Sequence, residues 1–501
     1  MTLLLTLPIA IPLVFAVLAI LLRGSKPAQI RLALTGAAGL LVVAILLTVT
    51  VNRHGIQATQ FGNWPAPFGI SFVADHLSSA MVLISALLGL ACLVYSIGEI
   101  DQQRVSFGFF PLILVLQGSV NGAFLTGDLF NLYVWFEVLL ITSFVLLTLG
   151  NERTQTKGAL PYITLHLFSS AIFLAAVGTI YGMTGSLNMA ELARRAGTPE
   201  LASALTPGAI LLFCALGTKA AVFPLFFWLP EAYPTPPVSV SAIFAGLLTK
   251  VGIYALLRIF TLIFVHDTAY THGILLALSG ITMITGVLGA AAQNEFRRIL
   301  SFHIISQIGY MIMGLALFSP LALSGTLFFV IHNIIVKSNL FLISGVTYRL
   351  RGSFELNSLG GLYRSHPALS VLFLISAFSL AGLPPLSGFW GKLLLAKAGF
   401  DSGQYLIISV SLVVSLLTLF SMLKIWIQAF WKPITSHLGS ALRHTHQPLY
   451  LYLLPITGLA ILTMGLGLFP RSLIAFANRA GAELHNPAAY IQAVLPQGGI
   501  Q

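Results

Sequence analysis

Long apolar runs dominate the hydrophobic pattern of this chain. They are about 20 residues long and lack the alternation of apolar and polar positions that is typical of a half-buried strand. A run of this kind crosses the hydrocarbon core of a bilayer as a helix. The pattern predicts fourteen spans, at residues 3–22, 31–51, 77–98, 108–126, 129–149, 159–183, 207–229, 238–262, 273–292, 298–318, 321–346, 367–397, 404–430 and 449–469. We therefore predict an all-α polytopic membrane protein whose helices form one bundle.

Composition agrees with a membrane location. Hydrophobic residues make up 57% of the 501 positions and charged residues 8%, whereas a soluble domain is about 25% charged. Because the bilayer core offers no water to backbone groups, each span must satisfy its own hydrogen bonds, as a helix does. The loops are short. One of the longer ones, 52–76, contains GNWPAPFGISF, whose alternation predicts a small surface hairpin.

Basic residues set the orientation. The formal net charge is +11, but the lysines and arginines are scattered among short loops, which argues against nucleic-acid binding. One set of alternate loops carries Arg23, Lys26, Arg31, Arg104, Arg153, Lys157, Arg297, Arg298, Arg349, Arg351, Arg364, Lys432 and Arg443. The opposite set, with the C-terminal tail, carries Arg53, Arg194, Arg195, Arg471 and Arg479. The excess marks the first set as cytoplasmic, so we expect both termini outside.

A few charged groups remain inside the spans. Of the fourteen acidic residues, we place only Glu137 deep in a span, about 12 Å from its start at 1.5 Å per residue. A charge at the centre of a span costs at least about 2.5–3.5 kcal/mol. The other deep titratable groups that we single out are Lys219, Lys250, His332, Lys337 and Lys392. Since burial disfavours the charged form of a lysine, these amines can release and regain a proton, as a proton relay requires.

Prolines accompany two of the lysines. Pro224 follows Lys219 within one span, and Pro384 and Pro385 precede Lys392 within another. Proline removes a helical hydrogen bond and frees a carbonyl. In a membrane this is tolerated where the freed group lines a cavity or meets water, and broken helices near the midplane indicate ion sites.

Each feature also has a structural explanation. A single lysine can snorkel or pair, as we expect of Lys424 near a membrane interface. His166 can simply bond a neighbouring backbone group, and a proline can mark a packing kink. The whole set within one chain favours a relay.

Five segments carry a family resemblance that extends over nearly the whole chain. They are GDLFNLYVWFEVLLITSFVLLTLG at 127–150, GTKAAVFPLFFWLPEAYPTPPVSVSAIFAGLLTKVGIYALLR at 217–258, RRILSFHIISQIGYMIMG at 297–314, HNIIVKSNLFLISG at 332–345 and LPPLSGFWGK at 383–392. The chain resembles the antiporter-like subunits shared by respiratory complex I, membrane hydrogenases and Mrp-type cation/proton antiporters. The wording NLYVWFEVLL is most similar to the D-type subunits of Mrp antiporters.

The resemblance implies a fourteen-helix fold with two inverted five-helix repeats and broken helices seven and twelve. It divides the chain into helices one to three (1–107), a first repeat of helices four to eight (108–262), a second repeat of helices nine to thirteen (273–430) and a last helix (449–469).

The resemblance also assigns roles in the first repeat. Glu137 resembles the carboxylate of the fifth helix, which pairs with Lys219 of the broken seventh. Lys250 resembles the connecting residue of the eighth helix.

In the second repeat, Lys337 with His332 near it resembles the relay of the eleventh helix. Lys392 resembles the terminal relay residue of the broken twelfth. His332 departs from the family pattern, because several relatives place the histidine four residues before the lysine, where this chain has Asn333.

From these observations we expect a membrane subunit that moves protons along a buried Glu/Lys/His axis. It would work with other membrane subunits of a hetero-oligomeric sodium/proton antiporter in the inner (plasma) membrane of a bacterium. We expect no enzymatic activity, no cofactor and no bound metal, and sodium would pass mainly through a partner. The alternatives are a proton-pumping subunit of an NADH dehydrogenase or membrane hydrogenase, a stand-alone secondary transporter, and a scaffold.

Overall fold

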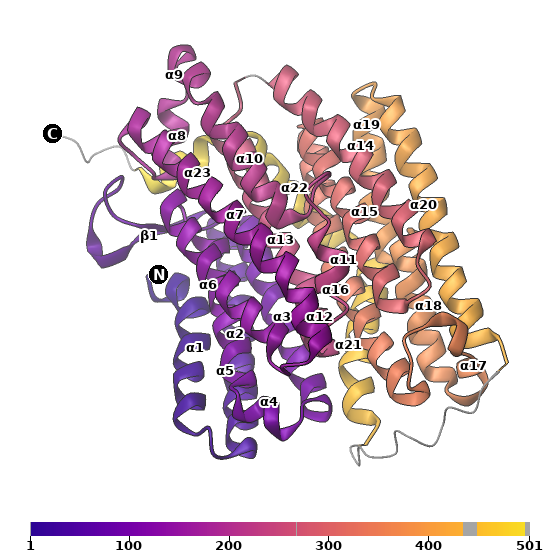
Figure 1. Cartoon of the computed structure of the whole chain (residues 1–501). Helices are drawn as coiled ribbons and strands as arrows, with labels where there is room; N and C mark the ends of the chain where they lie inside the picture. The colour runs from indigo at the N-terminus through magenta and orange to yellow at the C-terminus, as the bar shows by residue number, and fades with distance from the viewer. Residues whose placement is uncertain (1, 267, 434–447, 496–501) are drawn as a thin grey trace.

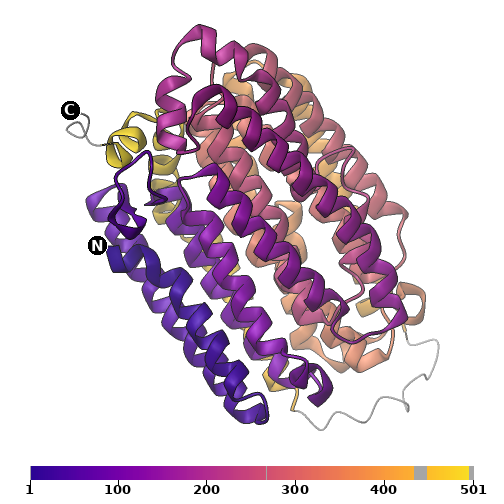
Figure 2. The ribbon, with the colours of Figure 1, turned by 60° about the vertical axis from the view of Figure 1, so that its left-hand side comes forward.

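The computed structural model describes residues 2–266, 268–433 and 448–495. Helices account for nearly all of it, and Figures 1 and 2 show them packed side by side in one bundle. Arg443, assigned above to a cytoplasmic loop, lies outside the described residues.

The N-terminal part contains four helices and a hairpin. The helices are α1 (Thr2–Leu21), α2 (Lys26–His54), α3 (His76–Glu99) and α4 (Gln102–Ser106). Strands β1 (Gln57–Gln60) and β2 (Ser71–Ala74) pair antiparallel, with the short helix η1 (Phe61–Asn63) after β1. The predicted hairpin in 52–76 is confirmed, although the residues of β2 are buried and not on the surface.

The middle of the chain begins with α5 and ends with α13. Its elements are α5 (Phe109–Leu125), α6 (Leu129–Thr148), α7 (Arg153–Thr184), α8 (Met189–Arg195), α9 (Pro199–Ala204), α10 (Thr206–Ala220), α11 (Trp228–Ala232), α12 (Val238–Ile243), the π-helical η2 (Phe244–Leu248) and α13 (Thr249–Leu262). The C-terminal part follows without a second domain. Its elements are α14 (Thr268–Ala292), α15 (Phe296–Leu317), α16 (Pro320–Arg351), η3 (Leu356–Ser358), α17 (Leu362–Ser365), α18 (Pro367–Ala381), α19 (Ser387–Asp401), α20 (Tyr405–Ile425), the π-helical η4 (Trp426–Trp431), α21 (Tyr450–Leu468), α22 (Arg471–His485) and α23 (Ala488–Val494).

Helices occupy every range that the sequence predicted to span the membrane. In the described residues, eleven helical stretches are long and apolar enough to cross a bilayer, and α5, α10 and α18 are shorter apolar helices. The number of fourteen crossings stays a prediction. In the most apolar part of α12–α13 and of α16, every residue is buried inside the bundle. In the corresponding part of α1, one third of the residues are buried. The centre of the bundle therefore lies around α13 and α16.

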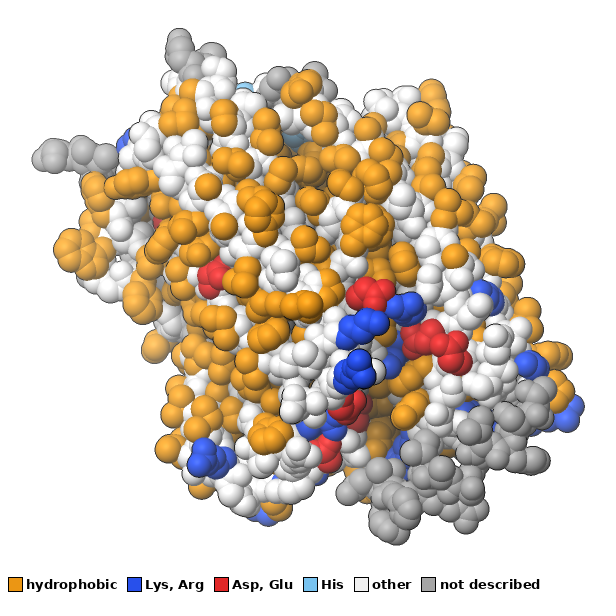
Figure 3. Space-filling view, viewed as in Figure 1, with side chains coloured by type: hydrophobic (Ala, Val, Ile, Leu, Met, Phe, Trp, Pro, Cys, Tyr) orange, Lys and Arg blue, Asp and Glu red, His pale blue; other side chains and the backbone are white. Residues whose placement is uncertain are grey.

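The outer face of the bundle suits a lipid environment. Figure 3 shows apolar side chains over most of one face, with charged side chains gathered in one zone. Many large apolar side chains are exposed on the outer helices, Val42 of α2, Ile141 of α6 and Leu416 of α20 among them. Such surfaces are stable in hydrocarbon and would be a liability in water.

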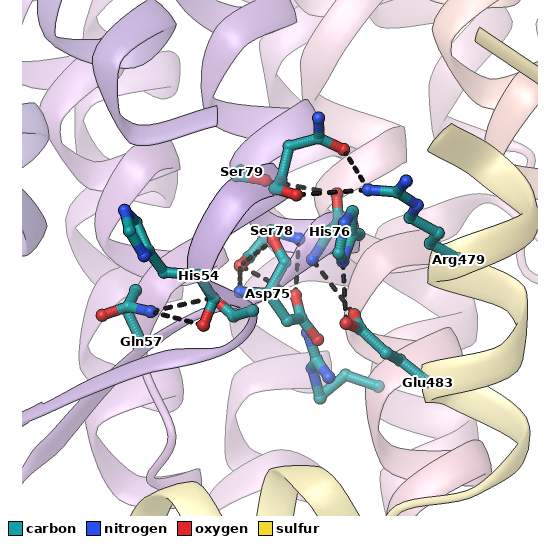
Figure 4. Close-up of polar contacts among 11 residues, drawn as sticks. His54, Gln57, Asp75, His76, Ser78, Ser79, Arg479 and Glu483 are labelled. Atoms are coloured by element: carbon teal, nitrogen blue, oxygen red, sulfur yellow. Dashed lines mark hydrogen bonds and ion pairs between the residues drawn. The ribbon is translucent and has the colours of Figure 1, made fainter. Parts of the chain in front are cut away.

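The sequence analysis did not predict the helices α8, α9, α22 and α23. Of these, α22 packs on α16 and α3. In Figure 4 its side chains reach α2 and α3. Glu483 Oε1 lies 2.7 Å from Nδ1 of His76, and Arg479 donates to the side chain and carbonyl of Asn52 at 2.9 and 3.1 Å. These contacts hold α22 across the end of the bundle.

Candidate functional site

The first helix break lies between α10 and α11. The backbone leaves the helix at Ala221, whose φ of 61° is left-handed. Freed backbone groups find side-chain partners: the indole of Trp228 donates to the carbonyl of Thr218 (3.0 Å), and the amide of Phe223 donates to the hydroxyl of Thr282 on α14 (3.1 Å). The break is therefore a specified structure, and it satisfies the backbone at a depth where water is scarce.

Lys219 lies in the last turn of α10, beside this break. A cation there is stabilised by the negative end of the helix dipole. Its side chain is 4% exposed. The ammonium donates to the hydroxyl of Ser170 on α7 (3.2 Å) and lies 5.1 Å from the ring centre of Phe136.

Glu137 does not form the close pair with Lys219 that the resemblance implies. No ion pair within 4.0 Å joins them in the part of the chain that the structure describes, although they interact electrostatically. The reason is the direction of the side chains on α6. Phe136 is buried and faces Lys219, whereas Glu137 follows about 100° round the helix and is partly exposed. His166, on the neighbouring α7, lies with its Nδ1 2.9 Å from the backbone carbonyl of Tyr162 in the same helix. This is the structural explanation that the sequence analysis gave for His166.

Lys250 follows the π-helical turn η2. Its side chain is fully buried, and the amine donates to the carbonyl of Ala245 within that turn (2.6 Å). π-helical turns occur frequently at functional sites. A Cβ on Gly252 would lie 2.8 Å from the backbone nitrogen of Ala220. The helix that carries Lys250 therefore packs directly on the broken end of α10.

Lys337 lies near the middle of α16, the unbroken helix at the centre of the bundle. It is fully buried, and its amine donates to the carbonyl of Leu300 on α15 (3.3 Å). It interacts electrostatically with both Lys250 and Lys392. Lys337 is thus the middle member of a row of three.

His332 connects α16 to the second broken helix. Its Nδ1 lies 2.8 Å from the hydroxyl of Ser387, the first residue of α19. A Cβ on Gly388 would lie 2.8 Å from its Nε2. The histidine therefore fits closely against the start of α19.

The second break, between α18 and α19, contains Pro384 and Pro385. Lys392, in the second turn of α19, reaches back across it and donates to the carbonyl of Ala381 (3.0 Å) and to the hydroxyl of Ser415 (3.0 Å). Lys392 is partly buried. The acceptor at Ala381 is a last-turn carbonyl that the end of α18 leaves without a helical partner.

The four lysines share one chemical property. Each amine donates to a neutral carbonyl or hydroxyl oxygen, and within the described segments none of them forms an ion pair with a carboxylate. Neutral oxygens accept from an amine as well as from an ammonium, whereas a carboxylate would favour the ammonium strongly. The arrangement can therefore accommodate both protonation states.

Sequence reasoning missed a buried ion pair near the other end of α13. Arg258 lies 2.7 Å from Asp75, and their side chains are 5% and 2% exposed. Burial would raise the pKa of Asp75, but the charge of Arg258 and the hydrogen bonds of Ser78 reverse this and hold that pKa below its usual value. Tyr254, one turn before Arg258, donates to the carbonyl of Phe124 (2.5 Å). The signal in the sequence was an arginine eight residues after Lys250.

A charged cleft opens at the end of the bundle that carries α4, between segments from the first and the second half of the chain. Its volume is about 670 Å³, and the charged zone in Figure 3 includes side chains of both signs. Arg298 lies 2.6 Å from Glu231 across the gap, and Arg104 lies 2.5 Å from Glu152. Among the described residues, no group of three or more His, Cys, Asp or Glu side chains is arranged to hold a metal ion.

The matched family covers the whole row of lysines. A family described as "NADH:quinone oxidoreductase/Mrp antiporter, TM" matches residues 126–418, which include every predicted relay residue from Glu137 to Lys392. This chain belongs to that antiporter family.

Members with names and structures resemble it over their full length. The D-type subunit of the Na(+)/H(+) antiporter of Alkalihalophilus pseudofirmus is 44% identical over 497 residues, which cover 98% of this chain and 99% of that protein. A chain in the structure of the Mrp complex from Dietzia sp. is 34% identical with a TM-score of 0.91, covering 99% of this chain and 100% of that one. A chain of respiratory complex I from Thermus thermophilus is 25% identical with a TM-score of 0.80, covering 96% and 100%. The antiporter fold therefore extends over the whole described chain.

Proposed function

We propose that this chain is the proton-translocating subunit of a multisubunit sodium/proton antiporter complex. Its 44% identity to the D-type subunit of a Na(+)/H(+) antiporter and its likeness to a chain of an Mrp complex support this assignment. The observation that carries the proton role is the row of lysines on broken and π-bulged helices, each bonded to a neutral oxygen.

In this proposal the proton moves along the row from one end of the bundle interior to the other. Glu137 biases Lys219 electrostatically towards the charged form, and a shift of this carboxylate releases the proton. Lys219 passes it towards Lys250, whose helix contacts the broken end of α10. Lys337 receives it next, because its helix α16 packs against η2, the turn that precedes Lys250.

The last steps involve His332 and Lys392. Water fills the gaps, since each amine is bonded to an oxygen of its surroundings and not to the next member of the row. The proposal keeps the expected inverted repeats at 108–262 and 273–430, each with one broken helix, and treats 1–107 and 449–469 as the helices beside them.

Sodium is assigned mainly to a partner subunit. Hard cations favour carboxylate and carbonyl oxygens, and Glu137 is the one carboxylate that we place at membrane depth. In the proposed relay this carboxylate already acts on Lys219. A sodium ion coordinated at Glu137 in a map of the intact complex would contradict this division of labour.

The proposed setting is a bacterial plasma membrane with both chain termini outside. The contacts Arg104–Glu152 and Arg298–Glu231 bring the positively charged loops together at one end. The sparsely charged loops meet at the other end, where Asp75 pairs with Arg258 and His76 with Glu483. This segregation supports the orientation that the positive-inside rule predicts.

A proton pump of the complex I type is the competing proposal. The fold is shared, but the identity to the complex I chain is 25% against 44% to the antiporter protein. Copurification decides between them: an antiporter complex contains other small membrane subunits and no flavin or iron–sulfur absorbance. A stand-alone transporter would instead exchange ions in vesicles that contain this chain alone.

The proton role is tested in the assembled complex with Lys219→Ala and Glu137→Ala. Both should abolish sodium-driven proton flux in vesicles, because each removes a titrating group of the first repeat. Lys157→Ala, an exposed lysine at the start of α7, is the matched control and should leave the flux unchanged. Full flux in both Lys219→Ala and Glu137→Ala would contradict a role in proton transfer and favour a scaffolding role.

A further inference from the structure

One face of α15 carries buried polar groups that the proposed relay leaves unused. His303 and Gln307 are both fully buried. Among the described residues, neither ring nitrogen of His303 and neither amide atom of Gln307 has a hydrogen-bond partner. A buried polar group without a partner destabilises the fold, and such groups in native proteins frequently serve a catalytic role or bind water. Both side chains therefore require an explanation.

This face of α15 runs between two of the lysines. Lys337 meets the helix at the carbonyl of Leu300, at 3.3 Å. Lys392 meets it at Tyr310, with the amine 4.8 Å from the ring centre. His303 lies three residues after Leu300 and seven before Tyr310, which is the spacing of one helical face. The whole distance is about 15 Å at 1.5 Å per residue, and the histidine lies within it.

His303 differs from His332 in what its ring can do. Both histidines interact electrostatically with Lys337 and Lys392. Nδ1 of His332 is engaged by the hydroxyl of Ser387, whereas both nitrogens of His303 are uncommitted within the described chain. An imidazole passes a proton on by accepting it at one nitrogen and donating from the other. His303 can do this without breaking an existing hydrogen bond.

We propose that His303 is a relay residue that carries the proton between Lys337 and Lys392, with the amide of Gln307 orienting the water beside it. This inference rests on the proposed function. The ammonium of Lys337 loses one proton to a nitrogen of neutral His303 and becomes a neutral amine. The imidazolium then releases the proton of its other nitrogen to the neutral amine of Lys392. The ring ends neutral in its second tautomer, and the water beside it restores the first by taking the proton from one ring nitrogen and returning one to the other.

Electrostatic repulsion makes this transfer sequential. The charged groups that act on His303 are Lys337 of α16 and Lys392 of α19, and Lys250 of α13 acts on Lys337 in turn. Like charges repel strongly at low dielectric, so a proton that arrives at Lys337 disfavours one held on the ring. Protons therefore move through the three sites one after another and do not accumulate.

The test compares two histidine-to-glutamine variants in the assembled complex. His303→Gln keeps a polar side chain that holds water but cannot carry a proton. His272→Gln on α14 is the matched control, because His272 is also buried (5% exposed) and packs against Phe318, away from the lysines. Sodium-driven proton flux, followed in vesicles with a pH-sensitive dye, should fall at least about tenfold in His303→Gln and stay unchanged in the control. The ratio of rates in H₂O and D₂O should rise in His303→Gln alone, since proton transfer becomes the slow step.

Each outcome decides the matter. Full flux in His303→Gln, while Lys219→Ala abolishes it, overturns the role of His303 and leaves the proposed function intact. Full flux in both variants overturns both. Should His303→Gln fail to assemble, His303→Asn is measured in its place. Failure of both to assemble assigns His303 to structure and overturns the proposal as well.

Discussion

The amine of Lys392 donates to the carbonyl of Ala381, across the break between α18 and α19. The prolines that end α18 therefore leave an acceptor free and place a lysine within its reach. Lys219 shows the complementary arrangement, in the last turn before its own break. At both breaks, the interruption of the helix gives an amine polar surroundings at a depth where it would otherwise be costly.

Lys392→Gln should abolish proton flux without preventing assembly. Glutamine can still donate to the carbonyl of Ala381, but it cannot gain or lose a proton at neutral pH. The flux is measured in vesicles and assembly by copurification. Lys397→Gln, an exposed lysine on the same helix, should behave as the unsubstituted protein, and loss of flux there would point to a general effect of charge on α19.

Gly252→Ala should destabilise the packing of α13 against α10. The new Cβ would lie 2.8 Å from the backbone nitrogen of Ala220, so either α13 or the end of α10 must shift. Overpacking of this kind costs about 1–3 kcal/mol. Thermal unfolding of the purified complex measures it. Gly178→Ala on α7, where a Cβ meets nothing within 4 Å, is the control, and an equal loss in both variants would contradict the close approach.

Asp75→Asn should destabilise the protein by about 3–5 kcal/mol, because it leaves the buried charge of Arg258 without its partner. Asp101→Asn removes an exposed partner of Arg104 and should cost at most about 1 kcal/mol. Chemical denaturation of both variants checks the difference.

The same pair predicts a dependence on pH. Since the pKa of Asp75 is lowered from the usual 3.8, its stabilisation is complete above that pH and is lost as the pH falls through the lower folded-state value. The free energy of unfolding of Asp75→Asn should therefore equal that of the unsubstituted protein in strong acid and be lower than it at neutral pH. A constant difference across this range would argue against the ion pair.

His76→Leu should loosen α22. It removes the side-chain contact with Glu483 and leaves only the amide of residue 76 to donate to that carboxylate (3.3 Å), while it keeps an apolar group against Phe476. A hydrogen bond to a charged group is worth about 1.5–3 kcal/mol, so amide exchange in α22 should accelerate about tenfold or more. Arg479→Gln breaks an exposed contact of the same helix and should change exchange much less.

The sequence predicted the helical bundle well because each span had to be predominantly apolar over about 20 residues to cross the hydrocarbon core. The breaks could be predicted too, since Pro224, Pro384 and Pro385 interrupt the runs. The partners of the lysines could not. Ser170 and the carbonyl of Leu300 are ordinary groups on other helices, and only the packing brings them to an amine.

Other features could not be found by searching the sequence for long apolar runs. Helix α22 carries Arg471, Arg479 and Glu483 among small residues, so its pattern is amphipathic and differs from the continuous apolar pattern of a membrane span. His303 was within a family motif, but it became notable only when its two nitrogens proved to lack partners in the described chain. The direction of Glu137 depended on how α6 rotates, which composition does not determine.

The wide turn of η2 places one more residue per turn in this helix than an α-helix would hold. Each residue advances an α-helix by about 100°, so closing this turn to α-helical geometry with the sequence unchanged would rotate the amine of Lys250 about a quarter-turn away from its present direction. Deleting one residue there would also close the turn, but the missing residue would offset that rotation and leave the amine facing the row. The wide turn itself therefore sets the direction of Lys250, and a change of helix type at 244–248 would take the amine out of the row without any exchange of side chains.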